Sequence, residues 1–347
     1  MKILVTGHHG YIGSVLAPLV AESGHEVTGL DAYFYRGCDL GSPVDWAPAV
    51  ERDVRDVSVA ELTGFDAVIH LAALSNDPIG DLNPDWTYDI NLDGSVDLAR
   101  RAKEAGVGTF VFASSCSMYG AASGDELVSE EAPLRPLTAY AESKVRAEEA
   151  LFELADSGFA PVSMRNATAY GASPRLRLDI VLNNLVGWAH TTGAINLQSD
   201  GTAWRPLVHI RDISAAAIAL LEAPAEAIRG EAFNIGSAEQ NYRIRDLAEV
   251  VREVMPECEV TYAEGAGTDP RSYRVDFGKL ERAFPELVLE WTAHRGAVEL
   301  VDAYRRAGLT REEFDGYRFV RLRQLRRLLD SGELNDELRR SSQAASR

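Results

Sequence analysis

A hydroxyl, a phenol and an ammonium group stand at spacings that could serve proton transfer. The apolar run over residues 111–113 breaks into hydroxyl side chains at Ser114 and Ser115. Downstream, Tyr140 and Lys144 lie four residues apart, which places them on one face of a helix. A hydroxyl, a tyrosine and a lysine brought together can polarise a carbinol and accept its proton. We therefore interpret Ser115, Tyr140 and Lys144 as the candidate reactive group.

The N-terminal part of the chain predicts a dinucleotide site. A strand-like run over residues 2–6 leads into Gly7, Gly10 and Gly13, spaced G-x-x-G-x-x-G ahead of a predicted helix. In such a turn the first glycine permits the tight bend, the second lets backbone approach a pyrophosphate, and the third packs helix on strand. A purely structural turn is the alternative. A second strand ends in Asp31, which would bind ribose hydroxyls and repel a 2′-phosphate, so NAD is favoured over NADP.

Later strand ends supply further candidates for this site. Asp53 follows a third strand-like segment and could meet an adenine edge, or be a surface aspartate. His70 ends a fourth strand, and we interpret it as a packed, hydrogen-bonded histidine rather than a catalyst. Residues 75–84 are interpreted as an exposed loop at the rim of the site. Asn91, inside a predicted helix over residues 85–105, could buttress the active-site strand.

The alternation of strand-like and helix-like segments predicts an α/β fold with a doubly wound parallel sheet. We expect residues 1–165 to form a Rossmann-type NAD-binding domain to which residues 207–235 return. Residues 166–206 and 236–310 would form a smaller, interleaved substrate-binding lobe. Residues 311–347 read as a charged, helical C-terminal extension without an indicated role.

Composition and charge exclude several classes of function. The 347-residue chain carries 35 Lys and Arg against 53 Asp and Glu, a net charge of −18, which argues against nonspecific binding to nucleic acid or an anionic membrane. No apolar run approaches the roughly 20 residues that span a bilayer. The chain opens on a strand-like run without a signal-peptide pattern, so we expect a cytoplasmic protein. The cysteines Cys38, Cys116 and Cys258 are far apart and predict neither a disulfide framework nor a metal site.

In combination, these motifs resemble a known family. The matching residues are Gly7, Gly10, Gly13, Asp31, Asp53, His70, Leu71, Ala72, Ala73, Asn91, Ser114, Ser115, Tyr119, Gly120, Tyr140 and Lys144. They are similar to the extended short-chain dehydrogenase/reductases and, more narrowly, to the nucleotide-sugar epimerase/dehydratase group. The resemblance runs from residue 1 to about residue 310 and is looser in its C-terminal part.

The resemblance implies roles for these residues toward NAD and a nucleotide-diphosphate sugar. Tyr140 would take the hydroxyl proton while NAD takes the hydride. Lys144 would hold the ribose hydroxyls and, with the nicotinamide charge, lower the pKa of Tyr140, and Ser115 would bind the same substrate oxygen. The implied cofactor contacts are Gly7, Gly10, Tyr11, Ile12, Gly13, Asp31, Asp53, Val54, Leu71, Ala72, Ala73, Asn91, Ser114, Tyr140 and Lys144.

The family also implies a substrate site and a dimer. Arg205 and Arg271 match positions that grip a diphosphate, with surface ion pairs as the alternative. The implied substrate contacts are Ser75, Ser115, Cys116, Ser117, Asn166, Thr168, Arg175, Arg205 and Arg271. A homodimer would pair the helices over residues 85–105 and 138–155 with their symmetry mates as a four-helix bundle.

Two departures from the family pattern bear on the reaction. In the 4,6-dehydratases of this group an acidic pair follows the residue matching Ser115, and its glutamate removes the C5 proton; here Cys116 and Ser117 stand there. Thr168 replaces an asparagine that in many members contacts the sugar or its diphosphate. We interpret Cys116 as a small packed residue, with an acid or base role beside a ketone as the alternative.

The absence of that acidic pair favours an NAD-dependent epimerase acting at C4 through a transient 4-keto sugar. A net sugar dehydrogenase or keto-sugar reductase would use the same three residues, so it remains an alternative. A 4,6-dehydratase is disfavoured by the missing carboxylates. A non-catalytic binding protein on this fold is disfavoured by the intact Ser115, Tyr140 and Lys144.

Overall fold

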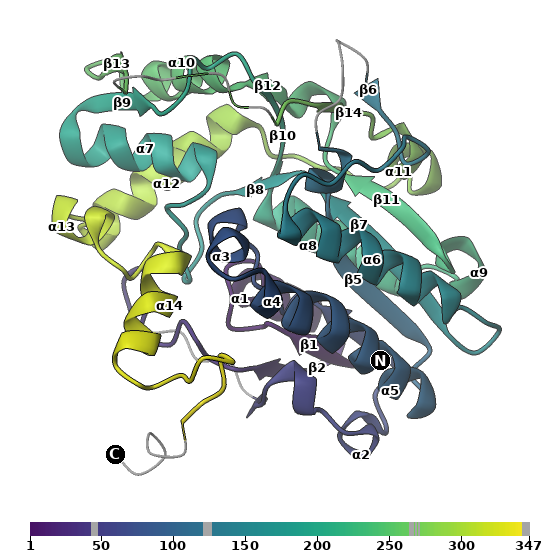
Figure 1. Ribbon diagram of the computed structural model, residues 1–347. Coiled ribbons are helices and arrows are strands. Elements are labelled where there is room, and N and C mark those ends of the chain that lie inside the picture. Colours follow the sequence, from purple (N-terminus) through teal and green to yellow (C-terminus); the bar gives the residue numbers. More distant parts are fainter. Residues whose placement is uncertain (43–47, 121–126, 264–266, 268, 270, 342–347) are drawn as a thin grey trace.

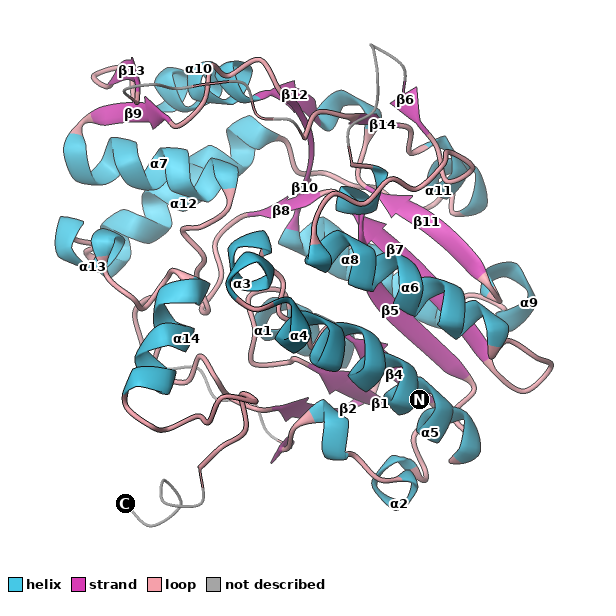
Figure 2. Ribbon diagram, in the orientation of Figure 1, coloured by secondary structure: helices cyan, strands magenta, loops and turns pink. Residues whose placement is uncertain are grey.

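A parallel seven-stranded sheet forms the centre of the structure (Figures 1 and 2). The computed structural model describes residues 1–42, 48–120, 127–263, 267, 269 and 271–341. The strand order is β11-β7-β5-β4-β1-β2-β3, and each neighbouring pair is parallel. The strands are β1 (Lys2–Thr6), β2 (Glu26–Asp31), β3 (Ala49–Glu51), β4 (Ala67–His70), β5 (Thr109–Ser115), β7 (Ala160–Asn166) and β11 (Glu231–Ile235).

Helices cover both faces of this sheet because its strands are apolar on both sides. Ile3 and Val5 of β1 pack in one core with helices α1 and α8, whereas Leu4 packs in another with α5 and α6. Neighbouring residues of a strand point to opposite faces, so each buried strand reads as a continuous apolar run. The predicted doubly wound parallel sheet is confirmed. These helices are α1 (Gly13–Glu22), α5 (Gly94–Glu104), α6 (Ala139–Glu153) and α8 (Ile210–Glu222).

The direction of winding reverses beside β1. This strand pairs with β2 on one side and with β4 on the other, so the chain runs outward through β2 and β3 and then returns to β4. The loops that leave β1 and β4 therefore diverge at the carboxyl edge of the sheet. In open parallel sheets such a reversal opens the crevice in which ligands bind.

The segment after β4 is more helical than the sequence indicated. Residues 75–84, expected to be a loop, contain α3 (Asp77–Leu82), because Asn76 accepts a hydrogen bond from the Ile79 amide and Pro78 stands in the first turn. The helix expected over residues 85–105 consists of α4 (Pro84–Thr87), a π-helical turn η2 (Tyr88–Asp93) and α5. The shorter helices elsewhere are η1 (Val54–Asp56), α2 (Val59–Leu62), η3 (Cys116–Tyr119), α9 (Ala225–Ile228), η4 (Ala238–Gln240) and α11 (Gly278–Ala283).

A second lobe with its own apolar core lies above the carboxyl edge of the sheet (Figure 1). Its helices are α7 (Val181–Thr192), α10 (Ile244–Val254) and α12 (Ala293–Ala307). One small sheet contains β8 (Thr168–Tyr170), β10 (Trp204–His209) and β12 (Asn241–Arg243), and a second pairs β9 (Ala194–Leu197) with β13 (Glu259–Tyr262). A two-stranded sheet pairs β6 (Leu127–Val128) with β14 (Arg274–Val275).

The segment over residues 207–235 only partly returns to the main sheet. Helix α8 and strand β11 do join it, but residues 207–209, which belong to β10, do not, contrary to the expectation for the whole segment. Strand β10 pairs with β8 and β12 in the three-stranded sheet, because β11 occupies the open edge of β7.

The C-terminal extension folds back onto the sheet domain. It contains α13 (Arg311–Asp315) and α14 (Arg321–Asp330), as expected for a helical segment. Its leucines Leu325, Leu328, Leu334 and Leu338 share a buried cluster with Leu74, Ile79 and Ile90, next to the loop after β4. In Figure 1 this yellow segment lies beside α3 and the end of β2. None of the described helices is both long enough and apolar enough to cross a membrane.

Candidate active site

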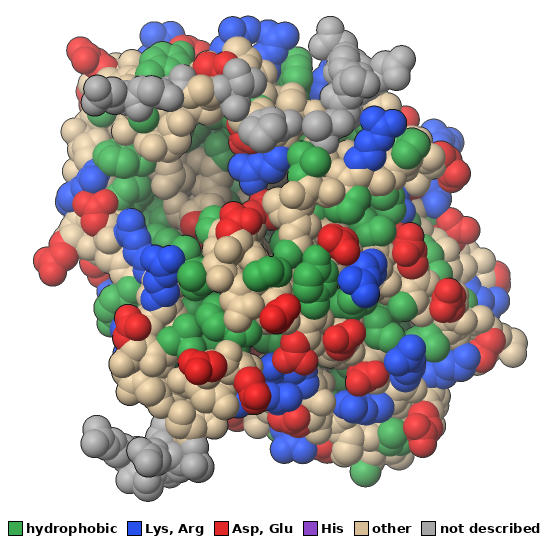
Figure 3. All heavy atoms as spheres, in the orientation of Figure 1, with side chains coloured by type: hydrophobic (Ala, Val, Ile, Leu, Met, Phe, Trp, Pro, Cys, Tyr) green, Lys and Arg blue, Asp and Glu red, His purple; other side chains and the backbone are tan. Residues whose placement is uncertain are grey.

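A cavity of about 930 Å³ opens at the carboxyl edge of the main sheet, between the sheet domain and the second lobe. Figure 3 shows the hollow on this face of the molecule. Fewer than half of the residues that line it were predicted from the sequence, and many of these lie in the loops at the ends of β1, β2, β4 and β5. The predicted residues that line it are Gly7, Gly10, Tyr11, Ile12, Gly13, Asp31, Asp53, Val54, Leu71, Ala72, Ala73, Ser75, Ser114, Ser115, Ser117, Tyr140, Lys144, Asn166, Thr168, Arg205 and Arg271.

The glycine-rich turn forms one end of this cavity and has no room for side chains. Gly7 has a φ of 74°, and a Cβ there would lie 2.7 Å from the amide nitrogen of Ala72. A Cβ on Gly13 would collide with the carbonyl of Gly7, just where α1 begins. Bare backbone at the start of a helix is the arrangement that binds a dinucleotide diphosphate.

Asp31 lies beside this turn at the end of β2. Its carboxylate accepts hydrogen bonds from the backbone amides of His9, at 3.2 Å, and Tyr33, at 2.7 Å. Burial raises the pKa of this carboxyl group, and the hydrogen bond from Tyr33 opposes that effect. The two amides therefore fix the carboxylate at the cavity wall, where its position suits ribose hydroxyls.

Ser115, Tyr140 and Lys144 are brought together as the spacing predicted. Thr138 caps α6 by accepting a hydrogen bond from the Ala141 amide at 3.2 Å, so the helix begins just before Tyr140. The Tyr140 phenol is hydrogen-bonded to Ser115, the last residue of β5. Lys144 donates to the Ala113 carbonyl at 2.7 Å, with its Nζ 6.0 Å from the centre of the Tyr140 ring.

Burial sets the proton affinities of this group. It raises the pKa of Tyr140 to about 12, an effect that the hydrogen bond to Ser115 opposes. It lowers the pKa of Lys144 to about 7. Both shifts follow from the cost of an ion in a buried site. A phenolate at Tyr140 therefore needs positive charge close by, which a protonated Lys144 or a cationic nicotinamide ring supplies.

Several buried polar atoms on the cavity wall have no hydrogen-bond partner among the described residues. They are Ser117 Oγ, Asn166 Oδ1, Asn196 Oδ1 and Arg321 Nη1. A buried polar group without a partner is costly. A polar ligand toward which these side chains turn would remove that cost, and a cavity of about 930 Å³ has room for a large ligand.

The arginines expected to grip a diphosphate lie at the cavity but have carboxylate partners. Arg205 pairs with Asp269 at 2.6 Å, and Arg271 pairs with Asp269 at 3.0 Å and with Asp77 at 2.6 Å. Asp77 also accepts a hydrogen bond from Thr138, which caps α6. The Arg271–Asp77 pair thus connects the loop before β14 to α3 across one side of the cavity.

Three predicted site residues lie outside the cavity wall. The Asn91 amide is fully buried and bonds both the N–H and the C=O of Leu74, at 2.8 and 3.0 Å, and so supports the loop after β4. Cys116 donates to the Arg165 carbonyl at 3.0 Å, and burial raises the pKa of its thiol, so it is packed as the sequence indicated. Arg175 is buried against His9 and Asp39.

The sequence analysis missed Arg177, Tyr273 and Arg321, which do line the cavity. Arg177 pairs with Asp179 at 2.9 Å and donates to the Ser75 hydroxyl at 3.0 Å. It belongs to the same loop as Arg175, and alternation along an extended segment would have given the two arginines the same direction, but a turn at residues 174–175 separates them. No local pattern indicated Arg321. His70 is packed as predicted, between Thr6 and Ser95, and burial lowers its pKa to about 3.

Comparisons with known proteins agree with this geometry. The model of the NAD dependent epimerase/dehydratase family matches residues 3–236. A UDP-glucose 4-epimerase of Corynebacterium glutamicum is 34% identical over 270 residues, which cover 73% of this chain and 80% of the relative. A UDP-glucuronic acid decarboxylase of Arabidopsis thaliana is 28% identical over 304 residues, 84% of each chain.

Solved structures share the fold over most of the chain. The NAD-dependent NDP-hexosamine 5,6-dehydratase TunA superposes with a TM-score of 0.78 at 25% identity, over 88% of this chain and 98% of that one. MoeE5 in complex with UDP-glucuronic acid and NAD gives a TM-score of 0.76 at 25% identity, over 88% of this chain and all of that one, 100%. The glycine turn, Asp31, Tyr140 and Lys144 all line the one cavity described above.

Proposed function

This chain belongs to the NAD dependent epimerase/dehydratase family, and we propose that it is a nucleotide-sugar epimerase that inverts C4. Its cofactor is NAD. The observation that carries the proposal is the surroundings of Ser115. Tyr140 and Lys144 are assembled beside it, yet the next two residues are a buried cysteine and a serine rather than carboxylates.

Tyr140, Ser115 and Lys144 have separate roles in the interconversion of an alcohol and a ketone. Bound NAD supplies the acceptor for a hydride from C4 and returns that hydride later. Tyr140 takes the proton of the C4 hydroxyl, and Ser115 holds the same oxygen by a hydrogen bond. Lys144 binds the cofactor ribose, and its protonation lowers the pKa of Tyr140 toward neutrality. The keto-sugar then rotates in the cavity, so that the hydride returns to the opposite face of the C4 carbonyl.

The environment of Cys116 and Ser117 supports inversion over dehydration. A 4,6-dehydratase requires a base that removes a proton beside the ketone, and the Cys116 thiol is bonded to the Arg165 carbonyl instead of facing the cavity. Ser117 lines the cavity, but its hydroxyl is buried and is not a base at neutral pH. The similar UDP-glucose 4-epimerase of Corynebacterium glutamicum makes a UDP-hexose the first substrate to test.

A substrate screen tests the proposal. UDP-, dTDP-, GDP-, CDP- and ADP-sugars are incubated with the purified protein in deuterated water, without added cofactor, and the products are identified by NMR. We expect inversion at C4, no deuterium in the product, and NAD retained on the protein. Turnover only with stoichiometric NAD would instead establish a net dehydrogenase or reductase. Deuterium beside the carbonyl would mean proton abstraction at C3 or C5.

Tyr140→Phe is the matched variant for this screen. It removes one hydroxyl and keeps the ring that packs near Lys144. We expect turnover to fall by at least about a thousandfold, in the upper range for general base catalysis, while NAD stays bound. Unchanged turnover would remove Tyr140 from the mechanism.

We also propose a cytoplasmic homodimer. Tyr88 of η2 and Val145 and Phe152 of α6 are partly exposed apolar side chains on helices that pack against each other. Pairing of these helices with their symmetry mates would bury them as a four-helix bundle. Light scattering that gives the mass of one chain would contradict the dimer.

A further inference from the structure

The C-terminal extension reaches the cofactor end of the cavity from a distant part of the sequence. Gln324 of α14 donates to the Phe34 carbonyl at 3.0 Å, and Trp86 donates to the Asp336 carbonyl at 2.6 Å. The leucines of the extension are buried against the loop after β4. The extension is therefore packed onto the two loops that follow β2 and β4, and both of these loops line the cavity.

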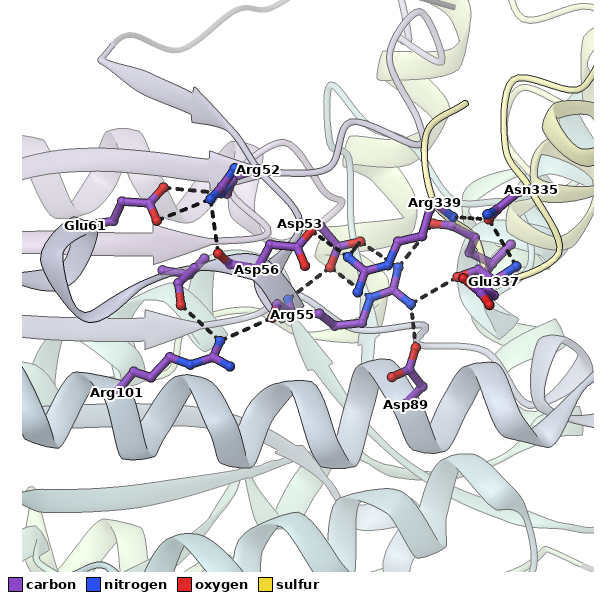
Figure 4. Close-up of polar contacts among 12 residues, drawn as sticks. Arg52, Asp53, Arg55, Asp56, Glu61, Asp89, Arg101, Asn335, Glu337 and Arg339 are labelled. Atoms are coloured by element: carbon purple, nitrogen blue, oxygen red, sulfur yellow. Dashed lines mark hydrogen bonds and ion pairs between the residues drawn. The ribbon is translucent and has the colours of Figure 1, made fainter. Parts of the chain in front are cut away.

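A cluster of ion pairs binds the end of the extension to the sheet domain. It consists of Asp53, Arg55, Asp56, Asp89 and Arg339, and we call it the Arg55 cluster. Arg55 pairs with Asp53 at 2.6 Å and with Asp89 at 2.5 Å, and Arg339 pairs with Asp56 at 2.6 Å and with Asp53 at 3.3 Å. Arg55 also donates to the Glu337 carbonyl at 3.0 Å. Figure 4 shows Arg55 and Arg339 converging on Asp53, which lines the cavity.

Arg321, the first residue of α14, places a guanidinium group on the cavity wall. Its side chain is buried, with the residue only 4% exposed, and its Nη2 donates to the Arg175 carbonyl at 3.0 Å. The guanidinium lies 4.0 Å from the centre of the Tyr35 ring. Its Nη1 has no hydrogen-bond partner in the described part of the chain, and no carboxylate there is within ion-pair distance of Arg321.

Three other arginines of the cavity, unlike Arg321, form ion pairs with carboxylates. Arg177, Arg205 and Arg271 each pair with a carboxylate at 3.0 Å or less. A buried cation without a direct ion pair is costly, and burial lowers the pKa of Arg321, an effect that the nearby Asp179 opposes. An anionic ligand would reverse this cost. The glycine turn and the N-terminus of α1, which attract a diphosphate, open onto the same cavity.

We propose that Arg321 binds the diphosphate of NAD, so that the extension over residues 311–341 completes the cofactor site. Its Nη1, which is buried but has no partner among the described residues, turns toward the cavity and donates to a phosphate oxygen opposite the glycine turn. The Arg55 cluster holds the extension in the position that this contact requires. The proposal concerns the cofactor alone and holds whichever sugar reaction the protein performs.

Ligand binding to protein stripped of cofactor tests this role, with Arg321→Gln as the variant. Isothermal titration would compare NAD and ADP, which contain a diphosphate, with adenosine, which does not. We expect the variant to bind NAD and ADP about 10- to 100-fold more weakly, as for loss of one hydrogen bond between charged groups, and adenosine with unchanged affinity. Arg326→Gln is the matched control, because Arg326 lies on the same helix with its side chain exposed; it should change none of these affinities.

Two further measurements separate this role from its alternatives. UDP alone, as a probe of the substrate site, should bind Arg321→Gln as it binds the wild type. Weaker UDP binding with unchanged NAD binding would assign Arg321 to the substrate diphosphate and overturn the proposal. If the variant lost affinity for adenosine as much as for NAD and ADP, the role of Arg321 would be structural only. If the glutamine variant fails to fold, Arg321→Lys still tests the role because it keeps a cation. It should retain most of the ADP affinity of the wild type. A lysine variant that binds ADP as weakly as adenosine would also refute the role.

Discussion

Burial of the protonated Lys144 side chain should lower the free energy of unfolding of the protein. Its Nζ bonds the Ala113 carbonyl at 2.7 Å and lies 4.5 Å from the centre of the Phe112 ring, but it has no carboxylate partner among the described residues. Burial lowers its pKa from 10.5 to about 7. We therefore expect Lys144→Met to stabilise protein stripped of cofactor at neutral pH, although the same change removes a residue of the reaction.

The sign and size of this effect follow from the two pKa values. Between about pH 7 and 10.5 the unfolded chain keeps the Lys144 proton and the folded chain has lost it, so the free energy of unfolding of the wild type rises with pH in that window. The full difference, 10.5 − 7 or about 3.5 pH units, corresponds to about 5 kcal/mol at 1.36 kcal/mol per unit. Below pH 7 the whole penalty is present. The methionine variant binds no proton and lacks this dependence.

Urea unfolding of both proteins at pH 7, 8 and 9 measures the effect. The stability advantage of Lys144→Met over the wild type should shrink by about 2–3 kcal/mol from pH 7 to pH 9. Loss of the hydrogen bond to Ala113 lowers the stability of the variant by an amount that does not vary with pH, so the change with pH isolates the charge. Lys2→Met, which removes an exposed ammonium group, is the control. An advantage that stays constant within about 0.5 kcal/mol from pH 7 to pH 9 would refute the reasoning.

Three other substitutions test particular contacts. Asn91→Ala leaves the N–H and C=O of Leu74 buried without partners and should lower the free energy of unfolding by about 2–6 kcal/mol, at about 1–3 kcal/mol for each group. In the same urea assay Asn83→Ala, which removes a more exposed helix cap, should lower it by about 1 kcal/mol. Cys116→Ala should leave the rate and product stereochemistry of the epimerase assay unchanged, and a tenfold fall in rate would give the thiol a chemical role. Arg339→Ala removes the ion pairs to Asp53 and Asp56 and should speed proteolytic cleavage within residues 331–341, monitored by mass spectrometry; cleavage at the wild-type rate would contradict the fastening role of the Arg55 cluster.

The parts of the site that the sequence predicted are those encoded by local spacing. The glycine turn, Asp31 at a strand end, and Tyr140 four residues before Lys144 each depend on one strand or one helical turn. Asn91 was predicted as a possible buttress, and it does bond the backbone of the loop after β4, but the π-helical turn η2 in which it lies has no mark in the apolar pattern. Arg321 was missed because its neighbours, Tyr35 and Arg175, are far from it along the chain. Contacts of that kind depend on the packing of whole elements, which hydrophobic periodicity does not specify.

The C-terminal extension also bears on the class of reaction. An enzyme with net redox chemistry must exchange its cofactor in every turnover, whereas an epimerase regenerates NAD in place and gains from holding it. The Arg55 cluster joins the extension to Asp53, on the wall of the cavity, and α14 packs against the loop after β4. If NAD leaves only when this segment moves, the Arg55 cluster and the leucine contacts must break with each release. Release of NAD slower than turnover would then be compatible with an epimerase and not with a dehydrogenase, on grounds independent of Cys116 and Ser117.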